Sequence, residues 1–368
     1  MLILSDSTIH TLLINLSKQD LLHFQQKLQT SLINFSTTSE KDFQPPPGIT
    51  ARPNGQKALF RPFTSPSSIG CKIIVDPAPD PLTSDKDVLH GVLVVCDEKG
   101  LPKGLINAEE VTGFRTALCS LIFWVARRRT AKVVVFGAGK VALWTARLCL
   151  ALRGEEVASL VVVNRRKERA EELVGTLRGE NERRWKSGVE IRVVESGEEE
   201  EVGKVLGEAD AVFCTVPSDA VLFDGKYVRR EEGQPKPYIS AIGSWRPNMI
   251  ELDPELLKRV VSERIYNPIT RNDAGFILVD DRKSVSEHTG EVLQSKLSEA
   301  QMIEVGEMLE VREHIGESEQ SARLRTHLEE GFLIYKSVGV SVTDLASGEA
   351  ILDLANKHGN LGTLITNF

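Results

Sequence analysis

The chain has few cysteines, and their spacing fits neither a disulfide framework nor a metal site. The cysteines are odd in number and far apart: Cys71, Cys96, Cys119, Cys149 and Cys214. Zinc sites and disulfide-rich folds need paired or closely spaced cysteines, so neither class is expected and no metal is predicted. Each cysteine lies within an apolar run, which is typical of buried thiols in a reduced compartment.

The sequence also lacks an excess of positive charge and any long apolar run. Its 45 Lys and Arg residues face 52 Asp and Glu residues, for a net charge of -7. No lysine- or arginine-rich face is obvious beyond the short run Arg127 to Arg129, so a nucleic-acid partner is not expected. The opening stretch, MLILSDSTIHTLLINLS, has neither the basic segment nor the apolar core of a signal peptide or membrane anchor. We therefore expect a cytoplasmic protein with no membrane partner.

The length and composition predict two packed units. The chain has 368 residues, of which 41% are hydrophobic and 26% charged, and it exceeds the size at which one hydrophobic core stops growing. Residues 1–128 contain helical spacing and then β-branched runs typical of a curled antiparallel sheet. We expect residues 1–128 and 318–368 to form a smaller α+β unit.

The middle of the chain predicts a doubly wound parallel sheet. Between residues 129 and 317, apolar runs such as AKVVVFG, SLVVVN, DAVFCTVP and PYISAIG alternate with helical stretches. Strands that are apolar throughout are buried on both faces, which is typical of parallel sheets covered by helices. The predicted fold is therefore α/β, with a Rossmann unit at 129–317.

A glycine-rich turn follows the first strand of this unit. The turn has the pattern G-x-G-x-x-A and comprises Gly137, Ala138, Gly139, Lys140, Val141 and Ala142. In a dinucleotide site the first glycine permits a tight turn, the second lets the backbone approach the pyrophosphate, and the third small residue lets helix and strand pack closely. The helix N-terminus then faces the phosphates. The alternative is a turn of this type that holds no ligand.

The end of the second strand predicts NADP(H) rather than NAD(H). An NAD site places Asp or Glu there to bind the ribose hydroxyls, but this chain has Asn164, Arg165 and Arg166. Two guanidinium groups suit a 2'-phosphate through charge-assisted hydrogen bonds. The alternative is that both arginines are ordinary solvated surface residues.

These motifs together resemble the ornithine cyclodeaminase and mu-crystallin family. The resemblance extends from Arg52 to the YKSVG segment at 335–339, and the matching segments keep the family's order: LFRP, GCKIIV, TGFRTALCS, GAGKVA, VVVNRRKERAEEL, GEADAVFCTVPS, AIGSWRPNMIELDPELL, VDDRKSVSEHTGE and YKSVGVSVTDL. The resemblance implies a Rossmann unit paired with a dimerisation and substrate-binding unit that is built from both chain ends, residues 1–128 and 318–368. It also implies a homodimer in which the small sheets join.

The resemblance further implies which residues hold the substrate. Arg52, Lys72 and Arg115 fall on the family's substrate-pocket positions, where the arginines clamp a carboxylate and the lysine faces the reacting carbon. Guanidinium groups match carboxylates in bidentate fashion, and a buried lysine can shift its pKa enough to exchange a proton. The alternative for each is a surface cation with a buried stem.

Four further residues are expected near the cofactor from the same resemblance. Thr116, Thr215 and Ser337 are carried over as cofactor neighbours. His90 occupies a family position near the cofactor, with a structural histidine as the favoured alternative.

Two positions depart from the cyclodeaminase pattern. Trp245 stands where the cyclodeaminases carry an aspartate, and Leu59 replaces a pocket glutamate. Both losses argue against ring closure of ornithine and favour the mu-crystallin branch, which resembles NADPH-dependent ketimine reductases. Trp245 would then form an apolar wall for a larger or less polar substrate, unless it only packs within its loop.

The sequence therefore predicts an NADPH-dependent reductase acting on C-N bonds. Its substrate would be a small imine, or the related amino or keto acid, that bears a carboxylate. Three alternatives remain open: an amino-acid dehydrogenase running the reaction in reverse, an ornithine cyclodeaminase, and a protein that only binds NADPH and a small acid.

Overall fold

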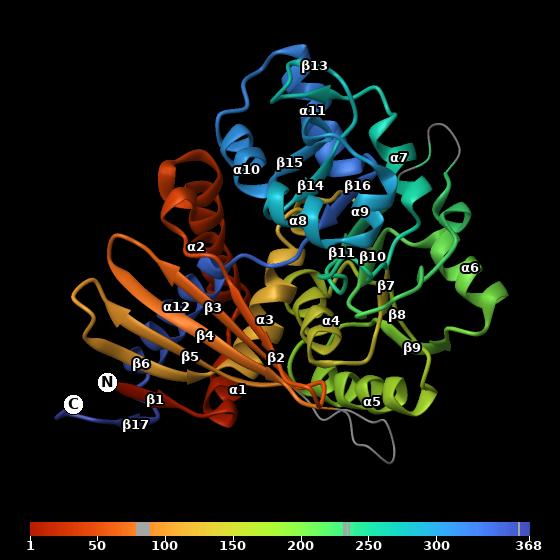
Figure 1. Cartoon of the computed structure of the whole chain (residues 1–368). Coiled ribbons are helices and arrows are strands. Elements are labelled where there is room, and N and C mark those ends of the chain that lie inside the picture. Colours follow the sequence, from red (N-terminus) through yellow and green to blue (C-terminus); the bar gives the residue numbers. More distant parts are fainter. Residues whose placement is uncertain (79–88, 231–233, 235, 360) are drawn as a thin grey trace. The chain divides into compact units, whose positions relative to one another are not determined.

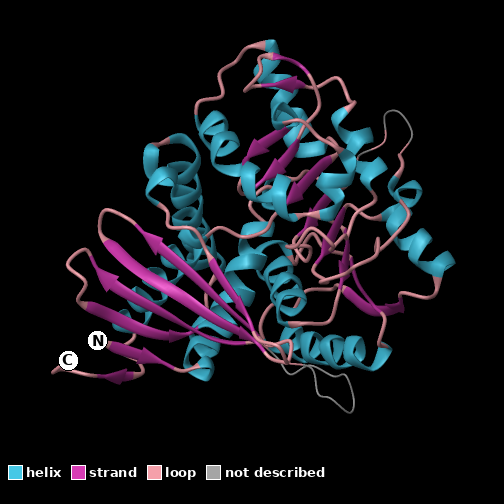
Figure 2. Ribbon diagram, viewed as in Figure 1, coloured by secondary structure: helices cyan, strands magenta, loops and turns pink. Residues whose placement is uncertain are grey.

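The chain folds into two compact units. The computed structural model describes residues 1–78, 89–230, 234, 236–359 and 361–368. Unit 1 comprises residues 1–115 and 340–368, and unit 2 comprises residues 116–339. The predicted fold class is confirmed, because a parallel Rossmann sheet fills unit 2 and a smaller α+β arrangement forms unit 1 (Figures 1 and 2).

The predicted boundaries at 128/129 and 317/318 both lie within unit 2. Strand β16 (Leu333–Lys336) pairs with β11 and β14 in the parallel sheet, which keeps the chain in unit 2 until residue 339. At the other end, the Tyr238 hydroxyl donates to the Ser120 carbonyl at 2.7 Å and ties the end of a long helix to the same sheet. The predicted boundary at 317/318 assigns β16 and the C-terminal helix that follows it to the smaller unit, whereas the structure pairs β16 within the sheet of unit 2.

Unit 1 is a seven-stranded sheet with helices packed on it. Its elements are β1 (Leu2–Leu4), α1 (Asp6–Ile14), α2 (Lys18–Thr37), the 3-10 helix η1 (Ser39–Phe43), β2 (Gly48–Ala51), β3 (Lys57–Thr64), β4 (Ser68–Asp76), β5 (His90–Asp97), β6 (Pro102–Asn107), α3 (Ala108–Ser120, which ends in unit 2), α12 (Ser341–Lys357) and β17 (Thr363–Leu364). The strand order is β17-β1-β6-β5-β4-β3-β2. Among the described residues of this unit, β1 and β6 pair in parallel and the other neighbouring strands are antiparallel.

Side chains alternate between the two faces of this sheet, as the strand period requires. One face packs against α12, which in turn packs on α2 (Figure 1). Phe63, Lys72 and Leu93 are buried on that face. Lys72 on β4 is directly opposite Leu93 on β5, and Phe63 lies on β3 two residues after Arg61, the partner of Lys72 on that strand. On the opposite face, Phe60 and Ile69 remain 42% and 38% exposed.

Unit 2 is an eight-stranded sheet in which every pairing is parallel. Its elements are η2 (Trp124–Ala126), β7 (Lys132–Phe136), α4 (Lys140–Arg153), β8 (Ser159–Asn164), α5 (Lys167–Arg183), β9 (Glu190–Glu195), α6 (Glu199–Glu208), β10 (Ala211–Cys214), η3 (Gly225–Val228), β11 (Tyr238–Ala241), α7 (Pro254–Val261), the small pair β12 (Tyr266–Asn267) and β13 (Asn272–Asp273), β14 (Ile277–Val279), α8 (Arg282–His288), α9 (Gly290–Ser295), η4 (Glu299–Gln301), β15 (Met302–Glu304), α10 (Val305–Glu313), α11 (Glu319–Glu330) and β16.

The strand order places a topological switch beside the glycine turn. The sheet runs β9-β8-β7-β10-β11-β16-β14-β15, so the chain moves outward in one direction from β7 to β9 and then continues on the other side of β7. Ligands of such sheets bind outside the carboxyl ends of the strands at this switch. The glycine turn follows β7, directly at that point.

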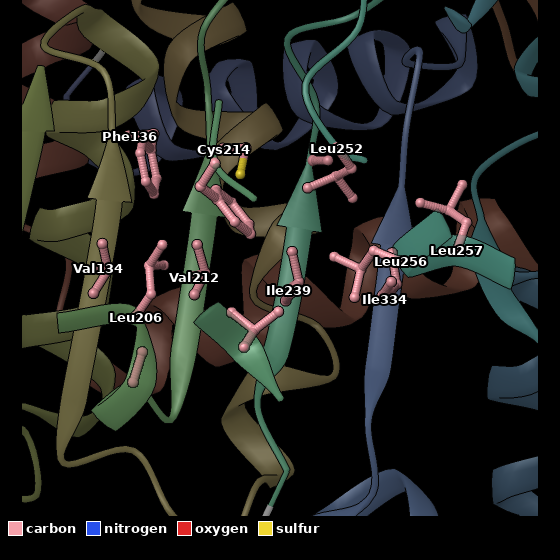
Figure 3. Close-up of a cluster of buried hydrophobic side chains, with 14 of the residues drawn as sticks. Val134, Phe136, Leu206, Val212, Cys214, Ile239, Leu252, Leu256, Leu257 and Ile334 are labelled. Carbon is pink, nitrogen blue, oxygen red and sulfur yellow. The ribbon is translucent and has the colours of Figure 1, made fainter. Parts of the chain in front are cut away.

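The core of unit 2 explains why these strands are apolar throughout. Val134, Val212, Ile239 and Ile334 lie side by side on β7, β10, β11 and β16 (Figure 3). Helix α7 packs on β14 and β16 with a strongly amphipathic face that includes Leu256, and α6, which carries Leu206, packs on β7 and β9. Within the described part of the chain, every helix is too short or too polar to span a bilayer.

Candidate functional site

The glycine turn after β7 has the geometry of a phosphate cradle. Gly137 has φ +115°, a left-handed conformation that favours glycine, and its N–H donates to the Val163 carbonyl at 2.9 Å. Gly139 precedes the first residue of α4, Lys140, and is exposed. A Cβ built on Gly139 would meet nothing within 4 Å. The backbone at the N-terminus of α4 is therefore open to close approach by a phosphate group.

Thr215, a predicted cofactor neighbour, packs against the first glycine of this cradle. A Cβ on Gly137 would lie 2.6 Å from Oγ1 of Thr215, so these residues are in close contact. The Thr215 hydroxyl donates to the Phe136 carbonyl at 2.8 Å, which fixes it beside the end of β7. Ala142 is fully buried, as the third small position of the pattern requires. Ala138 and Val141 are half-buried.

The end of β8 presents two exposed arginines. Asn164 is half-buried, and its side-chain amide donates to the Arg166 carbonyl at 2.8 Å. Arg165 and Arg166 are both exposed, and Arg166 directly precedes the first residue of α5. The turn therefore offers guanidinium groups at the strand end where a dinucleotide site distinguishes NAD from NADP.

A buried ionic cluster lies in unit 1 around Lys72. The Lys72 ammonium donates to Oδ1 of Asp344 at 2.7 Å and to the Thr112 hydroxyl at 3.4 Å. Nε of Arg115 donates to the same Asp344 oxygen at 2.9 Å. The side chains of Lys72 and Asp344 are 0% exposed, and that of Arg115 is 6% exposed. The structure thus brings two predicted site residues together through an aspartate that the sequence analysis did not single out.

Burial and neighbouring charges tune the lysine. The pKa of Lys72 is lowered from 10.5 to about 7: burial lowers it most, the charge of Asp344 raises it, and the charges of Arg115 and Arg61 lower it. Burial raises the pKa of Asp344, but the positive charges of Arg115, Lys72 and Arg61 outweigh this effect and lower it to about 2. Lys72 can therefore exchange a proton near neutral pH while Asp344 stays ionised.

Arg61 and Thr112 complete the cluster, and sequence reasoning missed both. Arg61 on β3 is directly opposite Lys72 on β4, so both side chains project from the same face of the sheet. The alternation of β3 and β4 could have identified Arg61, because the motif LFRP places it opposite the lysine once the hairpin register is known. Asp344 carries no such local signal, since it lies on α12 and is 272 residues from Lys72.

The other residues predicted in unit 1 lie at its surface. Arg52 is exposed, and its backbone N–H donates to the Gln56 carbonyl at 2.8 Å in the turn after β2. His90 is 61% exposed at the start of β5, and its Nδ1 lies 2.7 Å from Oε1 of Glu109. His90 is therefore exposed and paired with a carboxylate. Leu59 is half-buried on β3.

The remaining predicted residues belong to unit 2. Thr116 is half-buried in α3, where its carbonyl accepts from the Ser120 hydroxyl. Ser337 is buried after β16, and its hydroxyl donates to Oδ2 of Asp280 at 2.6 Å. Trp245 is half-buried in the loop after β11, with the guanidinium of Arg246 4.7 Å from its ring centre.

The described residues contain no group of three or more His, Cys, Asp or Glu side chains that could hold a metal ion.

Comparison with known sequences finds matches over almost the whole chain. A sequence model of the ornithine cyclodeaminase/mu-crystallin family matches residues 19–359. An uncharacterized protein of Saccharomyces cerevisiae is 25% identical over 97% of this chain and 98% of its own length. The Δ1-pyrroline-2-carboxylate reductase of Bacillus cereus is 23% identical over 79% of both chains.

Comparison with solved structures finds the same two-unit fold. The Δ1-pyrroline-2-carboxylate reductase of Thermococcus litoralis, in complex with NADH and L-proline, has a TM-score of 0.72 at 17% identity and covers 99% of this chain and 100% of its own. An archaeal alanine dehydrogenase dimer with bound NAD has a TM-score of 0.73 at 18% identity and covers 100% and 99%. At these identities the likeness shows the fold.

Proposed function

The chain belongs to the ornithine cyclodeaminase/mu-crystallin family, and from this premise we propose that it is an NADPH-dependent reductase of a carboxylate-bearing imine. The Bacillus cereus and Thermococcus litoralis proteins are named as reductases of a cyclic imino acid, and they share the family and the fold, respectively. The observation that carries the proposal is the fully buried Lys72, whose pKa is lowered to about 7 between Asp344 and Arg115. A lysine prepared in this way suits proton transfer at a substrate nitrogen.

The proposed reaction divides its tasks between the two units. A reduced nicotinamide, when bound, supplies the hydride that adds to the imine carbon. Gly137 and Gly139 would hold its pyrophosphate, because the turn leaves the backbone open at the N-terminus of α4. Lys72 would donate one proton to the imine nitrogen, so that C=N gains one hydride and one proton and becomes the amine.

The other members of the unit 1 cluster prepare Lys72 and the substrate for this step. Asp344 favours the charged lysine and fixes its direction with a 2.7 Å hydrogen bond. Arg115, held by the same carboxylate at 2.9 Å, is the proposed ligand of the substrate carboxylate. Arg52, in the exposed turn after β2, is proposed as the second carboxylate ligand.

The choice of NADPH over NADH rests on the end of β8. Arg165 and Arg166 place two positive charges where the 2'-phosphate of NADPH would lie, and no carboxylate stands in the first position after the strand. Exposed guanidinium groups can reach a phosphate without the cost of leaving a charge buried. This supports NADP(H), although the related structures were determined with NADH and NAD.

We also propose that the protein is a homodimer joined through the sheet of unit 1. The face opposite α12 is apolar on three adjacent strands, with Phe60 on β3, Ile69 and Ile73 on β4, and Val94 on β5. Exposed apolar surface of this kind is typical of protein interfaces. A second copy of the chain is the proposed occupant, because the structurally similar alanine dehydrogenase is a dimer. Sedimentation velocity at several concentrations tests this.

The central test is an assay with both cofactors. Purified protein is mixed with NADPH or NADH and a panel of cyclic imino acids, and also with keto acids plus amines, while cofactor oxidation is followed. We expect turnover of a carboxylate-bearing imine that is faster with NADPH. Faster oxidation of amino acids in the reverse assay would favour a dehydrogenase. Ammonia release from a diamino acid without net cofactor consumption would favour a cyclodeaminase. NADPH binding without turnover across the panel would favour a binding protein.

A further inference from the structure

Three charged side chains are completely buried at the carboxyl edge of the unit 2 sheet. Glu251 follows β11, Glu291 lies on α9, and Lys336 ends β16; each side chain is 0% exposed. The Lys336 ammonium lies 3.4 Å from Oε2 of Glu251 and 3.1 Å from Oε1 of Glu291. Burying three charges is costly unless each is well paired, so their position calls for a physical reason.

Glu251 holds the backbones of two different loops. Its Oε2 accepts the N–H groups of Gly243 at 2.6 Å and of Ser244 at 3.0 Å, in the loop after β11. Its Oε1 accepts the N–H of Val216 at 3.2 Å, in the loop after β10. A single carboxylate therefore joins the two loops that follow these adjacent strands.

Two further contacts fix these loops: Glu291 binds Ser244 in the loop after β11, and Gly243 in that loop packs against Val216 in the loop after β10. Both carboxylate oxygens of Glu291 lie 2.8 Å from the Ser244 hydroxyl, which donates to them. A Cβ on Gly243 would lie 2.2 Å from the Val216 carbonyl oxygen, so the loops touch and only glycine fits between them. The result is a rigid connection from Val216 to Ser244.

The two loops carry residues assigned to the proposed reaction. Thr215 precedes Val216 and contacts Gly137 of the phosphate cradle. Trp245 follows Ser244 and stands at the position that distinguishes this chain from the cyclodeaminases. Both loops leave the carboxyl ends of strands beside the topological switch, where parallel sheets bind their ligands.

We propose that Glu251, Glu291 and Lys336 are positioning residues, which fix the loops bearing Thr215 and Trp245 and thereby set cofactor affinity and substrate preference. This inference rests on the proposed function, because it needs a cofactor at this edge. The cluster touches neither cofactor nor substrate in the proposal. It acts through the three backbone N–H groups that Glu251 accepts.

The cluster also makes loop order depend on pH. Two carboxylates share one ammonium. Among the described residues, the thiol of Cys214 also faces these charges, and burial raises the pKa of this thiol well above its usual value. Burial raises the pKa of Glu251 from 4.5 to about 7; Lys336 opposes this rise and Glu291 adds to it. Because the pKa of Glu251 is higher in the ordered loops than in solvent, the ordered loops bind the proton more tightly than opened loops do. The loops are therefore expected to hold more firmly as the pH falls through about 7 and to loosen as the carboxyl group ionises above it.

The test replaces Glu251 with glutamine, which keeps the size but removes the charge and one acceptor oxygen. Hydrogen exchange of the Val216, Gly243 and Ser244 amides is measured with and without NADPH, from pH 6 to pH 8. We expect Glu251→Gln to speed exchange of these amides about 10- to 100-fold at pH 8. We also expect the wild-type change in protection around pH 7 to disappear.

Steady-state kinetics provides a second readout. Glu251→Gln is expected to raise KM for NADPH more than it lowers kcat, because loop order precedes the chemical step. Glu180→Gln is the matched control, since Glu180 is likewise buried in unit 2 and binds Nε and an Nη of Arg147 at 2.9 and 2.7 Å. The control should lower the melting temperature and leave the three loop amides unchanged.

The outcomes separate this inference from the proposed function. Equal exchange in the Glu251 and Glu180 variants would overturn the positioning role. Faster loop exchange in Glu251→Gln, in a protein that turns over no imine, would keep the positioning role and remove the proposed reaction. If Glu251→Gln does not fold, Ser244→Ala removes only the link to Glu291. An unchanged exchange rate at residues 243–245 in that variant would then overturn the inference.

Discussion

Replacing Asp344 with asparagine should shift the pH dependence of turnover without removing the lysine. Asp344 is the anion closest to Lys72, at 2.7 Å, and the other charges acting on the lysine come from Arg115 and Arg61. Asparagine keeps the shape but removes the negative charge. The lysine would then sit among positive charges alone and would lose its proton at lower pH.

The size of the shift follows from the geometry. A hydrogen bond to a charged group contributes about 1.5–3 kcal/mol, and 1.36 kcal/mol corresponds to one pH unit, so the alkaline limb should move about one to two units toward acid. Starting from a lysine pKa of about 7, turnover at pH 8 should fall about 10- to 100-fold. At pH 5 the loss should stay below about 2-fold, because most of the lysine remains protonated.

The assay is a pH profile of kcat for wild type and Asp344→Asn, with saturating NADPH and imine. Wild-type Asp344 stays ionised throughout the profile because neighbouring positive charges outweigh the effect of burial and lower its pKa to about 2. Circular dichroism and NADPH affinity serve as controls for folding and cofactor binding. A uniform loss at all pH values, with the alkaline limb unmoved, would refute the assignment of Lys72 as the proton donor tuned by Asp344.

Three further changes test separate parts of the proposed site. Changing Arg165 and Arg166 to alanine should weaken NADPH binding about 10- to 100-fold and NADH binding far less, as measured by calorimetry; equal weakening would contradict the 2'-phosphate assignment. Lys72→Met, which fits a buried position, should reduce turnover at least about 100-fold while NADPH affinity is retained, and persistent turnover would remove the lysine from the chemistry. Gly139→Ala should leave the melting temperature unchanged, because its Cβ would meet nothing within 4 Å, but should weaken NADPH binding by blocking the pyrophosphate. Unchanged NADPH affinity in that variant would show that the phosphate does not approach this residue.

The sequence alone determined the architecture of unit 2 and its cradle. Strand, glycine turn and helix follow one another within a short stretch of chain, so the pattern of Gly137 and Gly139 already specifies the local geometry. Apolar runs identified the parallel strands because both faces of each strand are covered. Figure 3 shows one of these faces, at Val134 and Val212. The same reasoning failed for β16, whose neighbours in the sheet are distant in sequence.

Only the tertiary structure decided which charges meet. Asp344 reaches Lys72 across 272 positions, and Glu251 reaches Lys336 across 85. Such pairs leave no periodic trace in the sequence, because their contact depends on how helices and strands pack rather than on local conformation. The sequence could therefore place a lysine in an apolar strand. Its proton affinity depends on burial and on partners that folding brings beside it.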